Sequence, residues 1–232
     1  MSTPEIPDAL VPRLREEPPA QRAFPWERSV WEPIAHDVPD AAAALRDLPD
    51  RINRQIVRDA VQANLARDRV LGAFAPMLIW GGTHARRAFF ARAILTGVAR
   101  RGNRDEPVDD SIRDRLLEGA RRVQEDGAVA GFYYMNNEGH VKHLGGAYFT
   151  KWLAFTSMTG TIDGPEVAPV LDDRVITWIR ENTTPSEKLT TSRTPSYERY
   201  LELLDAWGAP YARTRTQVEL AIFELTRDRP AE

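Results

Sequence analysis

Apolar residues recur at every third or fourth position along most of the chain after residue 40, and this spacing is typical of helices that bury one face. One such stripe is formed by Ile52, Ile56, Ala60 and Val61. Asp50 precedes it and is a residue type favoured at helix N-caps, so we expect a helix to begin there.

The apolar segment from about residue 71 to 101 is interrupted by the sequence WGGTHARR, so we expect two helices that meet at Gly81 and Gly82. No stretch has the alternation of a convincing β-strand, and no repeat is present. The fold class is therefore predicted to be all-α. Further helical stripes are expected around residues 112–123, 132–135, 149–156, 175–179, 197–207 and 218–225.

The beginning of the chain has a different character. The sequence MSTPEIPDALVPRLREEPPAQ is rich in proline and acidic residues and lacks the apolar centre of a signal peptide. We expect residues 1–40 to be an extended or partly ordered segment that lies outside the fold, and residues 41–232 to form a single helical domain. No run of residues is apolar enough to suggest a membrane span.

Composition narrows the function classes. A hydrophobic content of 42% with six Trp and eight Phe provides for a sizeable core. The net charge of −3 means that an anionic partner would have to be bound by a local basic patch. The absence of cysteine excludes disulfides, Cys-ligated zinc, iron–sulfur clusters and thiol catalysis, and is compatible with a cytoplasmic location.

The candidate chemistry lies in HLGGAYFTKWLAF, residues 143–155. This stretch sets one ammonium group, on Lys151, against a strongly apolar helix that follows two glycines. Asp172 comes 21 positions later, at the expected start of the next helix. Taken alone, Lys151 is typical of a solvated helix residue and Asp172 of an N-cap, but their conjunction with the glycine turn favours a functional site.

These residues resemble a known family. LGGAYFTKW followed by VAPVLDDRV is similar to the helix-hairpin-helix DNA glycosylases, in particular to bacterial proteins with the 8-oxoguanine DNA glycosylase fold. That family has a glycine-containing hairpin, a lysine on its second helix, and an aspartate that begins a D-x-[HR]-V pattern. The resemblance is strongest over residues 129–180 and implies an all-α fold of about eight or more helices around a cleft, with the hairpin at about 129–160.

The resemblance implies roles for both residues. Lys151 would attack the sugar as a free amine and form a Schiff base, which makes AP-lyase cleavage available. Asp172 would stabilise the positive charge that develops on the sugar. The hairpin departs from the family's usual Pro-Gly-aliphatic-Gly pattern, with Leu144-Gly145-Gly146-Ala147 in its place. If Lys151 lies out of register, Asp172 would activate water and the enzyme would be a monofunctional glycosylase.

The expected partner is double-stranded DNA carrying a modified base, with no cofactor, metal, membrane or obligate protein partner. Glycines that let the backbone approach a phosphate, and basic side chains beside them, form the candidate DNA contacts. These are Gly145, Gly146, Ala147, His143, Thr150, His84, Arg86, Arg87 and Arg174. Arginines 86, 87, 92, 100, 101 and 104 form the one concentrated basic run.

A base cannot be attacked within the stack, so it must be flipped into a pocket that is commonly walled by aromatic rings. The candidate pocket residues are Trp80, Tyr133, Trp152, Trp207 and Phe223. Taken alone, aromatic residues of this kind are more often core residues than base-stacking ones, although one of them would still stack on the flipped base.

Four functions stay open on the sequence. The first is a glycosylase for a damaged base of the 8-oxoguanine type, acting in repair at the nucleoid. The second is a glycosylase for hypermodified phage bases, such as glucosylated hydroxymethylcytosine, acting in antiviral defence. The third is a catalytically inactive DNA-binding module. The fourth is a helical scaffold for other proteins, which the acidic pI of about 5.9 favours and the arginine run opposes.

Overall fold

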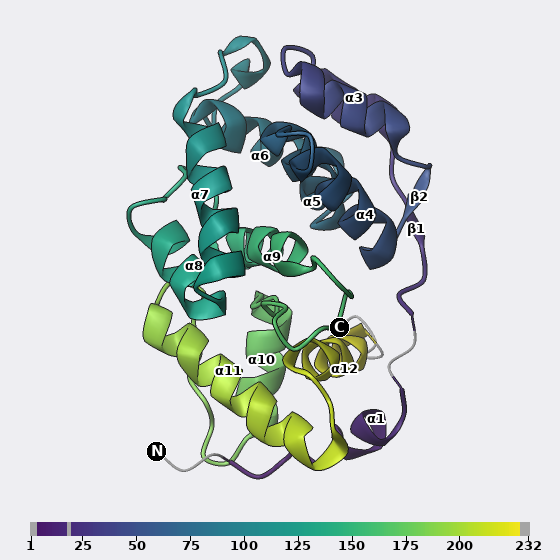
Figure 1. The fold of residues 1–232 in the computed structure, drawn as a ribbon, viewed down its shortest axis with the longest axis vertical. Coiled ribbons are helices and arrows are strands. Elements are labelled where there is room, and N and C mark those ends of the chain that lie inside the picture. The colour runs from purple at the N-terminus through teal and green to yellow at the C-terminus, as the bar shows by residue number, and fades with distance from the viewer. Residues whose placement is uncertain (1–3, 18–19, 228–232) are drawn as a thin grey trace.

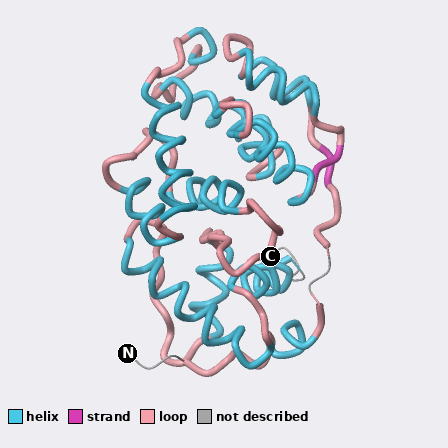
Figure 2. Tube along the Cα trace, in the orientation of Figure 1, coloured by secondary structure: helices cyan, strands magenta, loops and turns pink. Residues whose placement is uncertain are grey.

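The computed structural model describes residues 4–17 and 20–227, and within them the prediction of an all-α fold is confirmed (Figures 1 and 2). The upper helices in Figure 1 are α3 (Pro39–Asp47), α4 (Arg54–Leu65), α5 (Val70–Trp80) and α6 (Ala85–Thr96). The central helices are α7 (Ser111–Glu125), α8 (Ala128–Asn136) and α9 (Gly146–Ser157). The lower helices are α10 (Asp173–Asn182), α11 (Thr194–Gly208) and α12 (Arg215–Arg227), with the short α1 (Val11–Arg15) beside them.

Short elements complete the described chain. They are α2 (Arg28–Trp31), the 3-10 turns η1 (Glu32–Ile34), η2 (Asn103–Asp105) and η3 (Ala209–Tyr211), and the strands β1 (Phe24–Pro25) and β2 (Arg51–Ile52). Within this part of the chain, no helix is both long and apolar enough to span a membrane.

Two predicted helix boundaries had different outcomes. The junction at Gly81 and Gly82 is confirmed, because α5 ends at Trp80 and α6 begins at Ala85. The prediction that Asp50 caps α4 is wrong: the N-cap is Asn53, whose side chain accepts a hydrogen bond from the backbone of Ile56.

The two-residue strand β2 explains the error at Asp50. The sequence had not predicted any strand. Ile52 belongs to β2, which pairs antiparallel with Phe24 and Pro25 of β1. Asp50 uses its own carbonyl to accept from the backbone of Trp26. Ile52 was expected to be the first apolar residue of the helix. It is a strand residue instead, because it pairs with Phe24, which is distant in the sequence.

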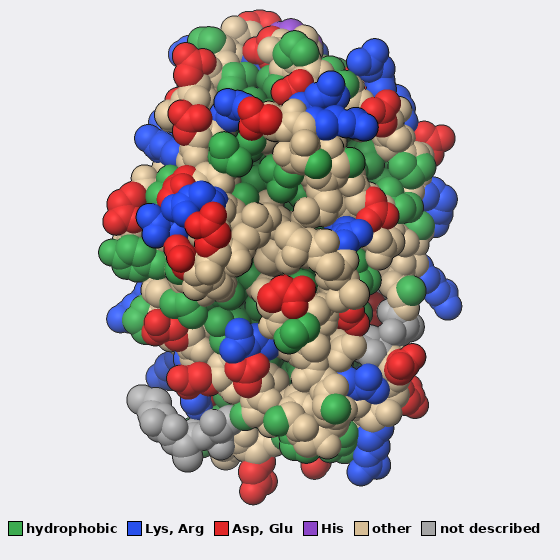
Figure 3. Space-filling model, viewed as in Figure 1, with side chains coloured by type: hydrophobic (Ala, Val, Ile, Leu, Met, Phe, Trp, Pro, Cys, Tyr) green, Lys and Arg blue, Asp and Glu red, His purple; other side chains and the backbone are tan. Residues whose placement is uncertain are grey.

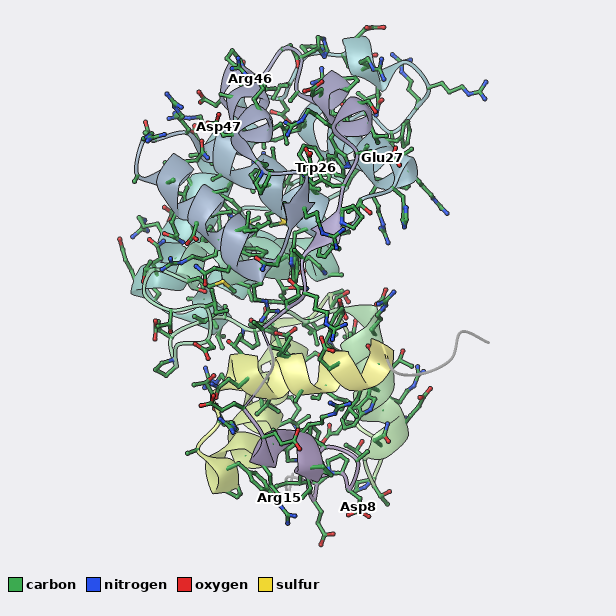
Figure 4. All side chains as sticks on the ribbon, turned by 90° about the vertical axis from the view of Figure 1, so that its right-hand side faces the viewer. Asp8, Arg15, Trp26, Glu27, Arg46 and Asp47 are labelled. Carbon is green, nitrogen blue, oxygen red and sulfur yellow. The ribbon has the colours of Figure 1, made fainter. Side chains whose placement is uncertain are left out.

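The N-terminal segment is more fully built into the fold than the sequence suggested. Leu10 and Leu14 are buried, and the carbonyl of Leu14 accepts from Arg213 Nε beside α12. Farther along, Trp26 is buried and donates to the carbonyl of Pro49. In Figure 4, Arg15 lies among the lower helices and Trp26 among the upper ones. The segment thus contacts both the lower and the upper helices.

Helix α9 lies at the centre of the molecule and is buried over most of its length (Figure 1). Trp152 packs edge-on against Phe74 of α5, with ring centroids 5.5 Å apart. Phe149 packs against Phe132 of α8, which stacks in turn on Tyr197 of α11. Helix α9 therefore packs directly on the upper and central helices, and Phe132 of α8 continues this packing to α11. Whatever α9 carries lies close to the middle of the protein.

The packing of α1 leads to a prediction. Replacing Leu14, which is 1% exposed, by Ala should lower the free energy of unfolding by about 2–5 kcal/mol, because it leaves a cavity against α12. Urea denaturation should show a lower midpoint with an unchanged slope. Arg15→Ala, one residue away and exposed, should have little effect. Equal stability of the Leu14→Ala and wild-type proteins would mean that α1 is not part of the folded core.

Candidate active site

A cleft of about 840 Å³ opens between the upper and the lower helices. One side is formed by residues 21–25 and Arg51, and another by Trp80, Gly81 and Arg87 of the upper helices. The remaining lining residues are Ala147, Tyr148 and Lys151 of α9, Asp172, Asp173 and Arg174 at the start of α10, and Phe223 of α12.

The structure brings Lys151 and Asp172 together in this cleft. Lys151 Nζ lies 3.5 Å from Asp172 Oδ2 and donates a hydrogen bond of 2.7 Å to the carbonyl of Ala147. The lysine is only 7% exposed. One buried amine and one carboxylate therefore face each other at a surface that a ligand can reach.

Asp172 is fixed by the helix that it begins. It is the N-cap of α10, and its Oδ1 accepts hydrogen bonds from the backbone of Arg174 (3.1 Å) and Val175 (3.2 Å). The positive end of the helix dipole favours a negative charge at this position. The capping interpretation and the functional interpretation of Asp172 are thus compatible, since Oδ1 serves the helix while Oδ2 faces Lys151.

Burial lowers the pKa of Lys151 below its ordinary value, because the charged form loses its water. The nearby carboxylates of Asp172 and Glu219 act in the opposite direction, and Arg87 lowers the pKa further. The net direction is downward. More of the uncharged, nucleophilic amine is therefore present at neutral pH than an exposed lysine would supply.

The loop that leads to Asp172 is held at three successive residues. Tyr197 and Tyr200 of α11 donate their hydroxyls to the carbonyls of Pro169 and Val170, each at 2.9 Å. Leu171 donates its backbone N–H to Thr150 Oγ1 at 3.3 Å. Since Thr150 precedes Lys151 on α9, this last contact ties the lysine's helix directly to the aspartate's loop.

This contact corrects the prediction for Thr150, which the sequence suggested as a DNA contact. The side chain is fully buried, and its hydroxyl also donates to the carbonyl of Gly146 at 2.8 Å. Gly146 is buried too, and a Cβ on it would come within 1.9 Å of the carbonyl oxygen of Thr191. Both residues therefore serve packing, and a glycine is required at 146 because the backbone of residue 191 passes so close.

The other predicted DNA contacts divide by position. Arg87, Ala147 and Arg174 line the cleft. His84, Arg86, His143 and Gly145 are exposed, so they remain available to a partner.

The basic run is not a single surface. Arg92 is 2% exposed and makes a bidentate ion pair with Asp37, at 2.6 and 2.8 Å, so it is a structural residue. Arg100 pairs with Glu106. Figure 3 likewise shows acidic and basic side chains interspersed on the face that it displays. Arg101 and Arg104 are exposed but do not line the cleft, so Arg87 is the member of the run whose charge lies there.

Two of the five predicted pocket residues lie in the cleft, namely Trp80 and Phe223. Trp152 and Trp207 are core residues: each is almost fully buried, and their indole N–H groups donate to the carbonyls of Leu116 and Pro4. Tyr133 is half exposed on α8 and does not line the cleft. The pocket assignment is corrected for these three residues.

The sequence did not identify Tyr148, which lies over the lysine. Its ring centroid is 5.4 Å from Lys151 Nζ and 5.5 Å from the Arg87 guanidinium carbon. Its hydroxyl donates to the carbonyl of Gly81 at 3.1 Å. Gly81 permits this approach, since a Cβ there would come within 2.7 Å of the ring. Glycine is therefore needed at position 81 so that the Tyr148 ring can pack there, an explanation that the sequence alone did not provide.

A buried ion pair below the cleft was also missed. Arg54 of α4 donates to both carboxylate oxygens of Glu219 on α12, at 2.9 and 3.2 Å, and both side chains are almost fully buried. The guanidinium lies 5.4 Å from the Trp80 ring centroid. Burial raises the pKa of Glu219, and Arg54 acts in the opposite direction. The pair joins the upper and lower helices next to Lys151.

Within the described residues, no group of His, Asp and Glu side chains could hold a metal ion.

The helical fold and the cleft shared by Lys151 and Asp172 agree with the family that residues 129–180 resemble. A family model described as "Putative 8-oxoguanine DNA glycosylase OGG-like protein" matches residues 17–223. The chain therefore belongs to this OGG-like family of DNA glycosylases. The match begins within residues 1–40, the segment expected from the sequence to lie outside the fold. No curated protein and no solved structure gives a significant match.

The state of Lys151 can be measured directly, because the chain has only three lysines, Lys142, Lys151 and Lys188. Nitrogen-15 NMR of the lysine side chains should show that Lys151 deprotonates below its ordinary pKa. Asp172→Asn should lower this pKa further, because the lost carboxylate favoured the ammonium form. A higher pKa in Asp172→Asn would contradict the assigned contact.

The hydroxyl of Thr150 can be tested against that of Thr156, since both are fully buried on α9 and donate to the carbonyl four residues earlier. Either Thr→Val change should cost about 1 kcal/mol of stability. Only Thr150→Val should also release Leu171 and lower the pKa of Lys151, because Asp172 is no longer held close. Thr150→Ser should restore it. Identical titrations in the two valine variants would show that Thr150 does not position the loop.

Proposed function

We propose that this chain is a DNA glycosylase that excises a damaged or modified base with Lys151 as the attacking amine and Asp172 as its electrostatic partner. The observation that carries the proposal is the 3.5 Å separation of Lys151 Nζ and Asp172 Oδ2 at the cleft. The lowered pKa of Lys151 supports it, because only the uncharged amine is a nucleophile.

The reaction follows from these two groups. A flipped nucleotide presents its C1′ to Lys151, and the N-glycosidic bond breaks as its electron pair leaves with the base. The Asp172 carboxylate stabilises the positive charge that forms on the sugar. The Lys151 nitrogen then bonds to C1′ and passes its surplus proton to Asp172, from which the departing base can take it. The C1′–O4′ bond then breaks as the nitrogen forms a Schiff base, and O4′ takes a proton from water. Loss of a C2′ proton to water forms a C2′–C3′ double bond while the C3′–O bond breaks, so the 3′ phosphate leaves with the electron pair and the strand is cleaved by β-elimination.

Duplex binding would rely on the arginines at the cleft. Arg87 and Arg174 were predicted from the sequence, and the structure adds Arg22 and Arg51 from the N-terminal side. Arg22, Arg87 and Arg174 are exposed, so their charges can reach phosphates. Contacts to phosphates position a duplex without reading its sequence, which suits an enzyme that must find a rare base in any context.

The base would lie between aromatic walls. Trp80 and Phe223 enter the cleft from opposite groups of helices, α5 and α12, and Arg174 lies 5.9 Å from the Phe223 ring centroid. Flipped bases are commonly held by stacking on such rings. Family membership favours an oxidised purine of the 8-oxoguanine type as the first substrate to test.

The test is a panel of duplexes that contain 8-oxoguanine, uracil, alkylated purines or glucosylated hydroxymethylcytosine, with borohydride to trap a covalent adduct. Lys151→Ala should abolish trapping, and Asp172→Asn should slow excision by about 10²–10³-fold. Lys142→Ala and Lys188→Ala are matched controls, because these exposed lysines are the only other ones in the chain and should leave trapping intact.

The same panel separates the alternatives. Strand breaks that need alkali, with no trapped adduct, would make Asp172 the activator of water and the enzyme monofunctional. Excision of the glucosylated base alone would assign the protein to the removal of hypermodified phage DNA. Duplex binding without abasic product on any substrate would overturn the proposal in favour of a catalytically inactive module.

A further inference from the structure

Gln21 lines the cleft from the N-terminal segment and makes two hydrogen bonds through one atom. Its Oε1 accepts from the backbone N–H of Arg54, the first residue of α4, at 2.7 Å. The same oxygen accepts from the indole N–H of Trp80 at 2.9 Å. The side chain therefore joins residue 21 to both the start of α4 and the end of α5.

These two donors determine which end of the Gln21 amide is the oxygen and which is the nitrogen. A backbone N–H and an indole N–H are donors only, so the atom that both contact must be the carbonyl oxygen. A flipped amide would place its NH₂ group against two donors. The orientation of Gln21 is therefore determined by chemistry, and its Nε2 must point away from Arg54 and Trp80.

Nε2 makes no hydrogen bond to the described part of the protein, since both bonds of this side chain use Oε1. Within the same residues, no buried side-chain nitrogen or oxygen lacks a partner. Nε2 is therefore accessible, and the surface that Gln21 lines is the cleft. An amide with two available N–H donors is thus presented to whatever occupies that space.

The donor is also held rigidly. Trp80 packs edge-on against Phe155, with ring centroids 5.0 Å apart, and Arg54 is fixed by Glu219 and lies against the Trp80 ring. Gln21 cannot rotate without losing two hydrogen bonds to groups that do not move. A donor oriented before the substrate arrives is effective in discriminating between ligands.

We infer that Gln21 is a specificity-determining residue that donates a hydrogen bond from Nε2 to an acceptor on the flipped base. This inference rests on the proposed function. The acceptor class is a carbonyl oxygen or an unprotonated ring nitrogen, on a base whose face contacts Trp80. A base that presents an amino group at the same edge would meet NH₂ with NH₂ and be rejected, because the donor would be left unpaired.

Gln21→Glu is the decisive variant. A carboxylate oxygen still accepts from Arg54 and Trp80, so the structural bonds are kept while the donor is lost. The kcat/KM for excision of the preferred base should fall by about tenfold or more. Borohydride trapping on a duplex with a preformed abasic site should persist, because that substrate has no base for Gln21 to contact.

Two further variants separate the loss of the donor from other effects. Gln21→Met is uncharged, has no donor and offers only a weakly accepting sulfur, so it should reduce excision to a similar extent and also lower the Tm. Gln55→Glu adds a negative charge at an exposed position of α4, outside the lining of the cleft, and should excise the base as the wild type does.

The outcomes are distinct. Wild-type excision by Gln21→Glu would overturn the inference. An equal loss of excision and abasic-site trapping in both Gln21 variants would also overturn it, because the residue would then act on Lys151 or on the fold. If the wild-type protein itself neither excises a base nor traps abasic DNA, the proposed function fails, and this inference fails with it.

Discussion

The burial of one ammonium group in the central helix is the constraint around which the rest of the site is arranged. Lys151 is the only charged residue of α9, and a charge that leaves water must be compensated by partners or by a change in its protonation. The carbonyl of Ala147 and the carboxylate of Asp172 supply part of that compensation, and the lowered pKa supplies the rest. The uncharged form of this amine is therefore more populated than that of an exposed lysine.

Several layers of structure hold this arrangement in place. The two tyrosine hydroxyls and Thr150 fix three consecutive residues before Asp172, so the carboxylate cannot drift from the amine. Below them, Arg54 and Glu219 join the upper and lower helices through a pair that is itself buried. Buried polar groups of this kind are costly unless every partner is present, and the described residues meet that condition.

The local sequence predicted the pairing of Lys151 with Asp172 but not the surroundings of the pair. Lys151 and Asp172 belong to a glycine–lysine–aspartate pattern within residues 143–175. Gln21 and Tyr148 are held in the cleft by contacts with Trp80 and Gly81, which lie far away in the sequence. The errors have a similar origin. Helix α9 is buried on nearly all sides, and its sequence has no polar face. The spacing of its apolar residues therefore could not show that Thr150 and Trp152 point into the core. The all-α class was predictable because most other helices are amphipathic.

The course of the N-terminal segment limits how the two groups of helices can move. The segment is fixed to the lower helices through Leu14 and to the upper helices through the pairing of β1 with β2. A chain anchored at both ends has a maximum length, so it limits how far the two groups can separate. It also occupies one side of the cleft as a wall. Whatever enters the cleft must therefore pass a side that this segment leaves open, so the path of the backbone gives the cleft one closed side.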